Sequence, residues 1–200
     1  GEKNGLTVKT LPWMIKKEDF CEYDPDKKDI DVCFICTINP GVAFHKRRLQ
    51  ILNNLIALKA SRPDMNIYIS APSLFPENAV YGDDYKRILG RSKIFIVEGS
   101  GRSCLTQKYL EAGISGCVLV GDRPMYPEKN IFIENEIMVV IDPTDADQLY
   151  GALTNILSNI DSYKTQRKNC MNKIIRHHDP EIVMNDLFFG LFSKNNESFH

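Results

Sequence analysis

A loop rich in glycine and serine is the part of this sequence best suited to holding an anion. The loop, Glu98-Gly99-Ser100-Gly101-Arg102, precedes a predicted helix over residues 103–112. Glycine lets the backbone approach a ligand closely, and the N–H groups at a helix N-terminus attract negative charge. Arg102 can donate two hydrogen bonds to one phosphate. We therefore expect Gly101, Arg102 and Ser103 to form a cradle for a diphosphate group, although such loops are also common as plain turns.

The next segment adds a carboxylate at a defined distance from this loop. Lys108 to Val120 has the sequence KYLEAGISGCVLV, a predicted helix, turn and strand. It resembles the signature R-x-x-E-A-x-x-x-G-x-x-x-V of GT-B glycosyltransferases, of the glycosyl transferases group 1 and spore-coat-maturation-like types. In those families the glutamate binds the ribose hydroxyls of the donor nucleotide. The resemblance places Glu111 in that role and Lys108 at the family's basic position, and it covers residues 83–178.

The resemblance implies a donor-binding domain of a glycosyltransferase. Such a domain takes part in transferring a hexose or deoxyhexose from a nucleoside-diphosphate sugar to a glycan or protein acceptor. Taken together, the loop, the basic residues and the resemblance give seven residues expected to bind the donor: Gly41, Arg48, Gly101, Arg102, Ser103, Lys108 and Glu111.

The chain departs from the family pattern in two places. Ser103 stands where the stricter E-x7-E form has a second glutamate, which leaves the contact to the sugar unassigned. The loop after the first strand contains only Gly41 as a glycine. No general base is identified. His45 is a candidate catalytic residue, but it fits an ordinary helix start equally well.

Two other functions stay open. The segment Ser115 to Val120 also resembles the G-C-x-P-V strand of exostosin-like glycosyltransferases, without its proline. A non-catalytic nucleotide-binding module that needs a partner domain would show the same alternation of strands and helices. Turnover of a donor by the isolated chain would favour an enzyme.

We expect no metal and no cofactor. The D-x-D triplets that begin at Asp24, Asp29 and Asp145 are predicted to be a turn, the start of a strand and a helix cap. Adjacent histidines on a helix point about 100° apart, so His177-His178 is predicted to be a solvated helix end rather than a metal site.

The elements that must position these residues alternate along the chain. Strands are predicted at 32–38, 66–71, 93–97, 117–120 and 136–141. Helices are predicted at 45–60, 83–89, 103–112, 144–157, 161–177 and 180–192, the last one returning across the domain. This alternation is typical of an α/β fold: a Rossmann-like three-layer sandwich with a mainly parallel sheet of five or six strands, resembling one half of a GT-B glycosyltransferase. We expect a leading segment (1–30), one nucleotide-sugar-binding domain (31–193) and a tail (194–200).

Composition excludes several classes of protein. The net charge is −1 and 43% of the residues are hydrophobic, which is ordinary for a globular domain and argues against nucleic-acid binding. No stretch of 18 apolar residues predicts a membrane span. Cys33 and Cys36 lie in an apolar strand whose alternation separates them, so we expect buried free thiols and a cytoplasmic location. The chain begins Gly-Glu-Lys without an initiator methionine, and we expect further domains of a larger parent chain.

Overall fold

A computed structural model describes residues 12–20, 24, 27–99, 104–125, 131–133 and 137–192. The strands are β1 (Ile30–Ile35), β2 (Ile67–Ser70), β3 (Ser92–Val97), β4 (Val118–Gly121) and β5 (Val139–Val140). The α-helices are α1 (Lys46–Ser61), α2 (Gly82–Arg91), α3 (Gln107–Ile114), α4 (Ala146–Ser158), α5 (Lys164–His178) and α6 (Pro180–Phe192).

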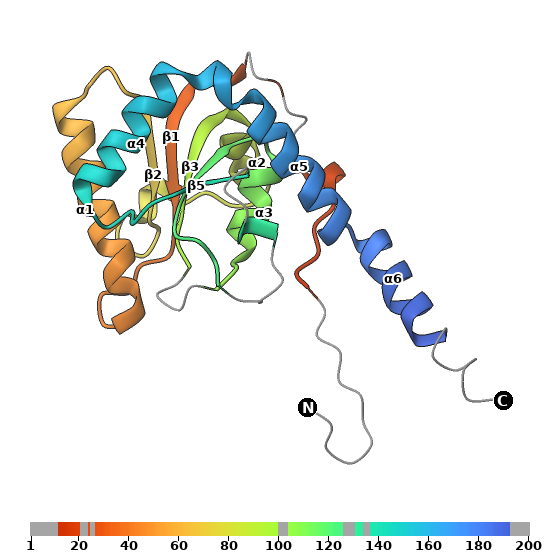
Figure 1. Ribbon diagram of the computed structural model, residues 1–200. Helices are drawn as coiled ribbons and strands as arrows, with labels where there is room; N and C mark the ends of the chain where they lie inside the picture. The colour runs from red at the N-terminus through yellow and green to blue at the C-terminus, as the bar shows by residue number, and fades with distance from the viewer. Residues whose placement is uncertain are drawn as a thin grey trace.

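The five strands form one parallel sheet in the order β2-β1-β3-β4-β5. Helices α1 and α4 cover one face, and α2, α3 and α5 cover the other (Figure 1). The predicted α/β three-layer fold is therefore confirmed. The chain runs outward from β1 to β2 and then returns to β3 on the other side of β1. The carboxyl ends of β1 and β3 thus flank the topological switch point, where sheets of this kind bind ligands.

The central strands are apolar on both faces because each face has its own core. Successive side chains of a strand point to opposite faces. The core under α1 and α4 takes Val32, Ile94, Ile96, Val118 and Val120 from the strands. The core under α3 and α5 takes Cys33, Ile35, Phe95, Val97 and Leu119. Cys33 and Cys36 are buried free thiols, as predicted.

Three strands are shorter than the sequence predicts, and β2 lacks one predicted residue at each end. The first ends at Ile35 rather than at Ile38, because the N–H of Ile38 donates to the Ser73 hydroxyl at 3.0 Å instead of to a neighbouring strand. The last contains only Val139 and Val140, followed by one further ladder bond from the Ile141 N–H to Gly121 O at 3.1 Å.

A predicted helix cap is confirmed at α4. The Asp145 carboxylate accepts hydrogen bonds from the backbone N–H groups of Asp147 and Gln148, at 3.0 and 3.1 Å. Asp145, the first residue of this triplet, therefore caps the helix.

A buried lysine ties the leading segment to the sheet. The Lys28 ammonium donates to the carbonyl oxygens of Gly90, Ser92 and Ser115 at 3.1, 2.8 and 3.0 Å. Burial lowers the pKa of Lys28. Because Gly90 and Ser92 lie where α2 meets β3 and Ser115 lies between α3 and β4, one side chain joins two junctions of the fold.

The prediction for the end of α5 is wrong at His178. This residue is only 5% exposed, and its Nδ1 lies 2.7 Å from the carbonyl oxygen of Trp13. The N–H of Ile15 in turn donates to His178 O at 2.9 Å. The N-terminal segment therefore covers the end of this helix, which local sequence around His178 does not reveal.

The last helix also differs from its prediction. Helix α5 crosses the domain and packs against α3, whereas α6 extends away from the sheet (Figure 1). Within the described part of the chain, no helix combines the length and apolar character needed to cross a bilayer.

Candidate functional site

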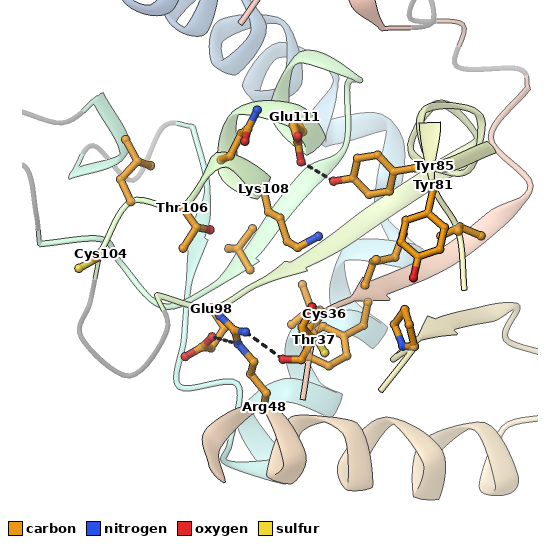
Figure 2. Close-up of a pocket in the computed structure, with 18 of the residues that line it drawn as sticks. Cys36, Thr37, Arg48, Tyr81, Tyr85, Glu98, Cys104, Thr106, Lys108 and Glu111 are labelled. Atoms are coloured by element: carbon orange, nitrogen blue, oxygen red, sulfur yellow. Dashed lines mark hydrogen bonds and ion pairs between the residues drawn. The ribbon is translucent and has the colours of Figure 1, made fainter. Parts of the chain in front are cut away.

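A pocket of about 710 Å³ opens at the switch point between β1 and β3. Its floor is formed by the last residue of β1 with residues 36–37, and by the last residue of β3 with Glu98. Its walls come from the first turns of α1, α2 and α3 (Figure 2). Ligand sites of α/β sheets occupy this position because loops at the carboxyl ends of the strands can vary without disturbing the core.

Helix α3 begins later than the sequence predicts. Its first residue is Gln107, and Thr106 at the N-cap position has an extended backbone. The N–H of Cys104, before the helix, donates to Gly99 O at 3.0 Å. The helix N-terminus therefore presents the N–H groups of Gln107 and Lys108, which have no partner inside the helix. Three residues of the expected diphosphate cradle lie outside the described residues: Gly101, Arg102 and Ser103.

Glu111 and Lys108 share one face of α3 and line the pocket. Residues three apart on a helix are neighbours on its surface. The Tyr85 hydroxyl, from α2, donates to Glu111 Oε2 at 2.5 Å, and the Lys108 ammonium lies 5.1 Å from the centre of the Tyr85 ring (Figure 2). Burial raises the pKa of Tyr85, with the nearby Glu111 charge adding to the effect, so the hydroxyl keeps its proton. Burial lowers the pKa of Lys108, while the charge of Glu111 raises it.

Arg48 forms the charged end of the pocket. Its Nε donates to Glu98 Oε2 at 2.8 Å, and its Nη1 donates to Thr37 O at 2.9 Å (Figure 2). The two charged side chains are 16% and 3% exposed. The first turn of α1 is thereby attached to the ends of both β1 and β3, with a guanidinium group at the pocket wall.

A neighbouring ion pair holds α1 in this position. Arg47 donates to Asp122 Oδ1 at 2.8 Å and to Asp142 Oδ1 at 3.0 Å. These carboxylates follow β4 and β5, so α1 is fixed across the sheet. Burial raises the pKa of Asp122, and the charge of Arg47 opposes that shift.

His45 lies beside Arg48, behind the pocket wall. Its Nδ1 accepts a hydrogen bond from the Asn39 N–H at 2.8 Å, and its Nε2 lies 3.3 Å from Arg48 Nη1. A backbone N–H can only donate, so Nδ1 is the acceptor in the contact with Asn39, and Nε2 faces an arginine nitrogen that is also only a donor. Gly41 is exposed in the same turn, where its N–H donates to Asn39 Oδ1 at 3.0 Å, outside the residues that line the pocket.

Comparison with solved structures identifies the architecture. HepE from Anabaena, solved in complex with UDP and glucose, matches with a TM-score of 0.68 and 10% identity, over 92% of this chain and 56% of that one. A glycosyltransferase from Rickettsia africae matches with a TM-score of 0.60 and 13% identity, over 89% and 55%. Sucrose-phosphate synthase from Thermosynechococcus elongatus matches with a TM-score of 0.60 and 13% identity, over 92% of this chain and 52% of that one.

The chain has the fold of one GT-B half. It spans about half the length of the solved structures that it matches. No family model and no curated protein matches the sequence. A fold of this kind serves different reactions, so function has to be argued from the site itself.

In this GT-B half, three of the residues expected to bind a donor line one pocket: Arg48, Lys108 and Glu111. Trp13 and Tyr81 also line it and were not expected there. Apolar periodicity carries no signal for either residue, because each reaches the pocket from a segment outside the predicted strands and helices.

Among the described residues, no group of three or more histidine, cysteine, aspartate or glutamate side chains is placed to hold a metal ion. The expectation of metal independence stays a prediction.

Proposed function

We propose that this chain is the donor-binding domain of a glycosyltransferase that uses a nucleoside-diphosphate sugar. One observation carries the proposal: Glu111, held by Tyr85 and accompanied by Lys108, lines a pocket at the switch point of a GT-B half. An acidic residue, cations and helix N–H groups in one pocket match the hydroxyls and phosphates of a nucleotide.

The Glu111 carboxylate is suited to binding a ribose. It has two oxygens and about four acceptor positions, and Tyr85 occupies one of them. The vicinal hydroxyls of a ribose can donate to the remaining positions. A carboxylate acceptor binds hydroxyl donors more strongly than a neutral acceptor does.

The diphosphate is proposed to lie between Arg48 and the start of α3. Arg48, Lys108 and the N–H groups of the first turn of α3 supply positive charge there. Gly101, Arg102 and Ser103 are proposed to complete this cradle. Charge develops on the diphosphate as the sugar leaves, and fixed donors stabilise it.

The comparisons support a donor of this class, because HepE was solved with UDP and glucose and shares the fold. Since the chain spans about half of such proteins, we propose that an acceptor site for a glycan or protein comes from another domain. The isolated chain is then expected to bind donor and to transfer sugar poorly.

Calorimetric titration with UDP, ADP and GDP tests the proposal. Glu111→Ala should weaken binding of the preferred nucleotide by at least about tenfold, because a hydrogen bond to a charged group contributes about 1.5–3 kcal/mol. Glu111→Gln keeps one acceptor and should lose less. Glu181→Gln changes an exposed glutamate in α6 and is the matched control. Unchanged affinity in a folded Glu111→Ala variant would show that the donor site is elsewhere.

The same titration tests metal independence. Binding should persist in EDTA, because Arg48, Lys108 and the helix N–H groups neutralise the phosphates in this proposal. A requirement for a divalent cation would contradict it.

A further inference from the structure

We propose that Trp13 stacks on the base of the bound nucleotide, in the pocket that Tyr81 also lines. The inference rests on the proposed function and adds the residue that recognises the base. Trp13 is 56% exposed and Tyr81 is 71% exposed, and both line the pocket. Large aromatic surfaces left open beside a polar site are suited to a flat ligand.

The polarity of the pocket orients the nucleotide. Arg48 and Glu98 lie at one end, Glu111 lies beside Tyr85 at the opposite end with Lys108 between, and Tyr81 lies on the side of Tyr85 away from Glu111 (Figure 2). A diphosphate at the charged end and a ribose at Glu111 leave the apolar part for the base. Val80, Tyr81 and Gly82 line that part, and Trp13 lines the same pocket.

The backbone around Trp13 is fixed although its side chain is exposed. His178 Nδ1 lies 2.7 Å from Trp13 O, and the Ile15 N–H donates to His178 O at 2.9 Å. Both His178 and Ile15 are buried. Met14, Ile15 and Lys16 line a second hollow together with Lys86 and Gln107, so the segment runs along the starts of α2 and α3. The segment is therefore anchored by its neighbours, and the indole is presented at the pocket.

Stacking of an aromatic side chain on a base contributes enough to be measured. Replacing such a residue by alanine typically costs about tenfold or more in affinity. Every base has an aromatic face, so the indole supplies affinity for a nucleotide over a sugar phosphate of the same charge.

The fluorescence of the chain gives a direct test, since Trp13 is its only tryptophan. Titration with the preferred nucleoside diphosphate should change the indole emission saturably, with the dissociation constant that calorimetry gives. Ribose 5-phosphate, which lacks a base, should leave the emission unchanged. Calorimetric binding of the nucleotide without any change in emission would overturn the inference.

Substitution provides a second test. Trp13→Ala should weaken nucleotide binding about tenfold and leave binding of ribose 5-phosphate and pyrophosphate unchanged, while Trp13→Phe should retain most of the affinity. Phe188→Ala removes an exposed aromatic ring from α6 and is the matched control. Nucleotide binding that survives Trp13→Ala at full strength overturns this inference alone. The absence of any nucleotide binding by the wild type overturns the proposed function as well.

Discussion

The Tyr85 hydroxyl donates to Glu111 Oε2 across 2.5 Å, so α2 and α3 are joined inside the pocket by a single hydrogen bond. The Lys108 ammonium near the same tyrosine ring adds a cation to this contact. Tyr85 therefore fixes the direction in which the Glu111 carboxylate presents its remaining acceptor positions.

Tyr85→Phe should weaken nucleotide binding by about threefold to tenfold while leaving the fold intact, because a typical hydrogen bond contributes about 0.5–1.5 kcal/mol. Calorimetry measures the effect. Tyr150→Phe removes a similar hydrogen bond, from the hydroxyl to Asn54 O at 2.7 Å, and is the control away from the pocket. Equal affinity in the two variants would mean that Glu111 needs no positioning by Tyr85.

Arg48→Met should lower the free energy of unfolding by about 3 kcal/mol, because it removes the arginine partner of a carboxylate that is 3% exposed. Adding Glu98→Leu should restore much of this loss, since the buried charge is then gone. Urea unfolding measures both effects. Neither variant should bind the nucleotide as tightly as the wild type, because both lack the Arg48 guanidinium.

Arg62→Met is the control for this pair. Arg62 and Asp64 are 44% and 65% exposed, and an exposed ion pair contributes less than about 1 kcal/mol. A similar loss of stability in Arg62→Met and Arg48→Met would show that removing the partner of a buried carboxylate destabilises the fold no more than removing the partner of an exposed one.

His178 should make stability depend on pH. Burial lowers the pKa of His178 below its ordinary value of 6.5, so the unfolded chain takes up the proton more readily than the folded one. The free energy of unfolding is therefore highest above pH 6.5 and falls as the pH drops below it. Urea unfolding at about pH 7.5 and about pH 5.5 measures the difference.

His178→Asn retains an N–H donor for Trp13 O but does not titrate, so it should reduce this pH dependence. His177→Asn removes the exposed neighbouring histidine and should leave it unchanged. If the free energy of unfolding changed equally with pH in the wild type and in both variants, His178 would be excluded as the source of the pH dependence.

Gly121→Ala should destabilise the fold by at least about 2 kcal/mol. Gly121 has a φ of +145°, and a Cβ there would lie 2.0 Å from the carbonyl oxygen of Val97. In contrast, a Cβ at Gly151 in α4 meets nothing within 4 Å, and Gly151→Ala should stabilise the protein by about 0.5–1 kcal/mol. Chemical denaturation of both variants checks this pair, and a stable Gly121→Ala variant would contradict the close approach of β3 and β4.

The sheet was predictable because each strand carries its own signal. Apolar runs such as Val32 to Ile35 and Lys93 to Val97 indicate strands covered on both faces, and helices with apolar periodicity separate them. The length of the edge strand β5 was overestimated. Apolar residues continue beyond Val139 and Val140, although the strand pairs with only one neighbour.

The site was predictable only where local sequence sets the geometry. Lys108 and Glu111 are three residues apart on one helix, so their shared face follows from helical spacing. The start of α3 was misplaced because the backbone of Thr106 is extended, which the pattern of residue types in this segment does not indicate. The burial of His178 and the position of Trp13 depend on packing between the two ends of the chain, which no local pattern records.

The short outer strands affect how copies of this chain meet one another. β2 has four residues and β5 has two, and these are the edges of the sheet. An edge strand recruits a foreign strand through its unsatisfied N–H and C=O groups, and a short one offers few of them. Concentrated solutions of the folded chain should therefore resist the growth of fibrils by strand addition, even though the interior of the sheet is almost wholly aliphatic and aromatic.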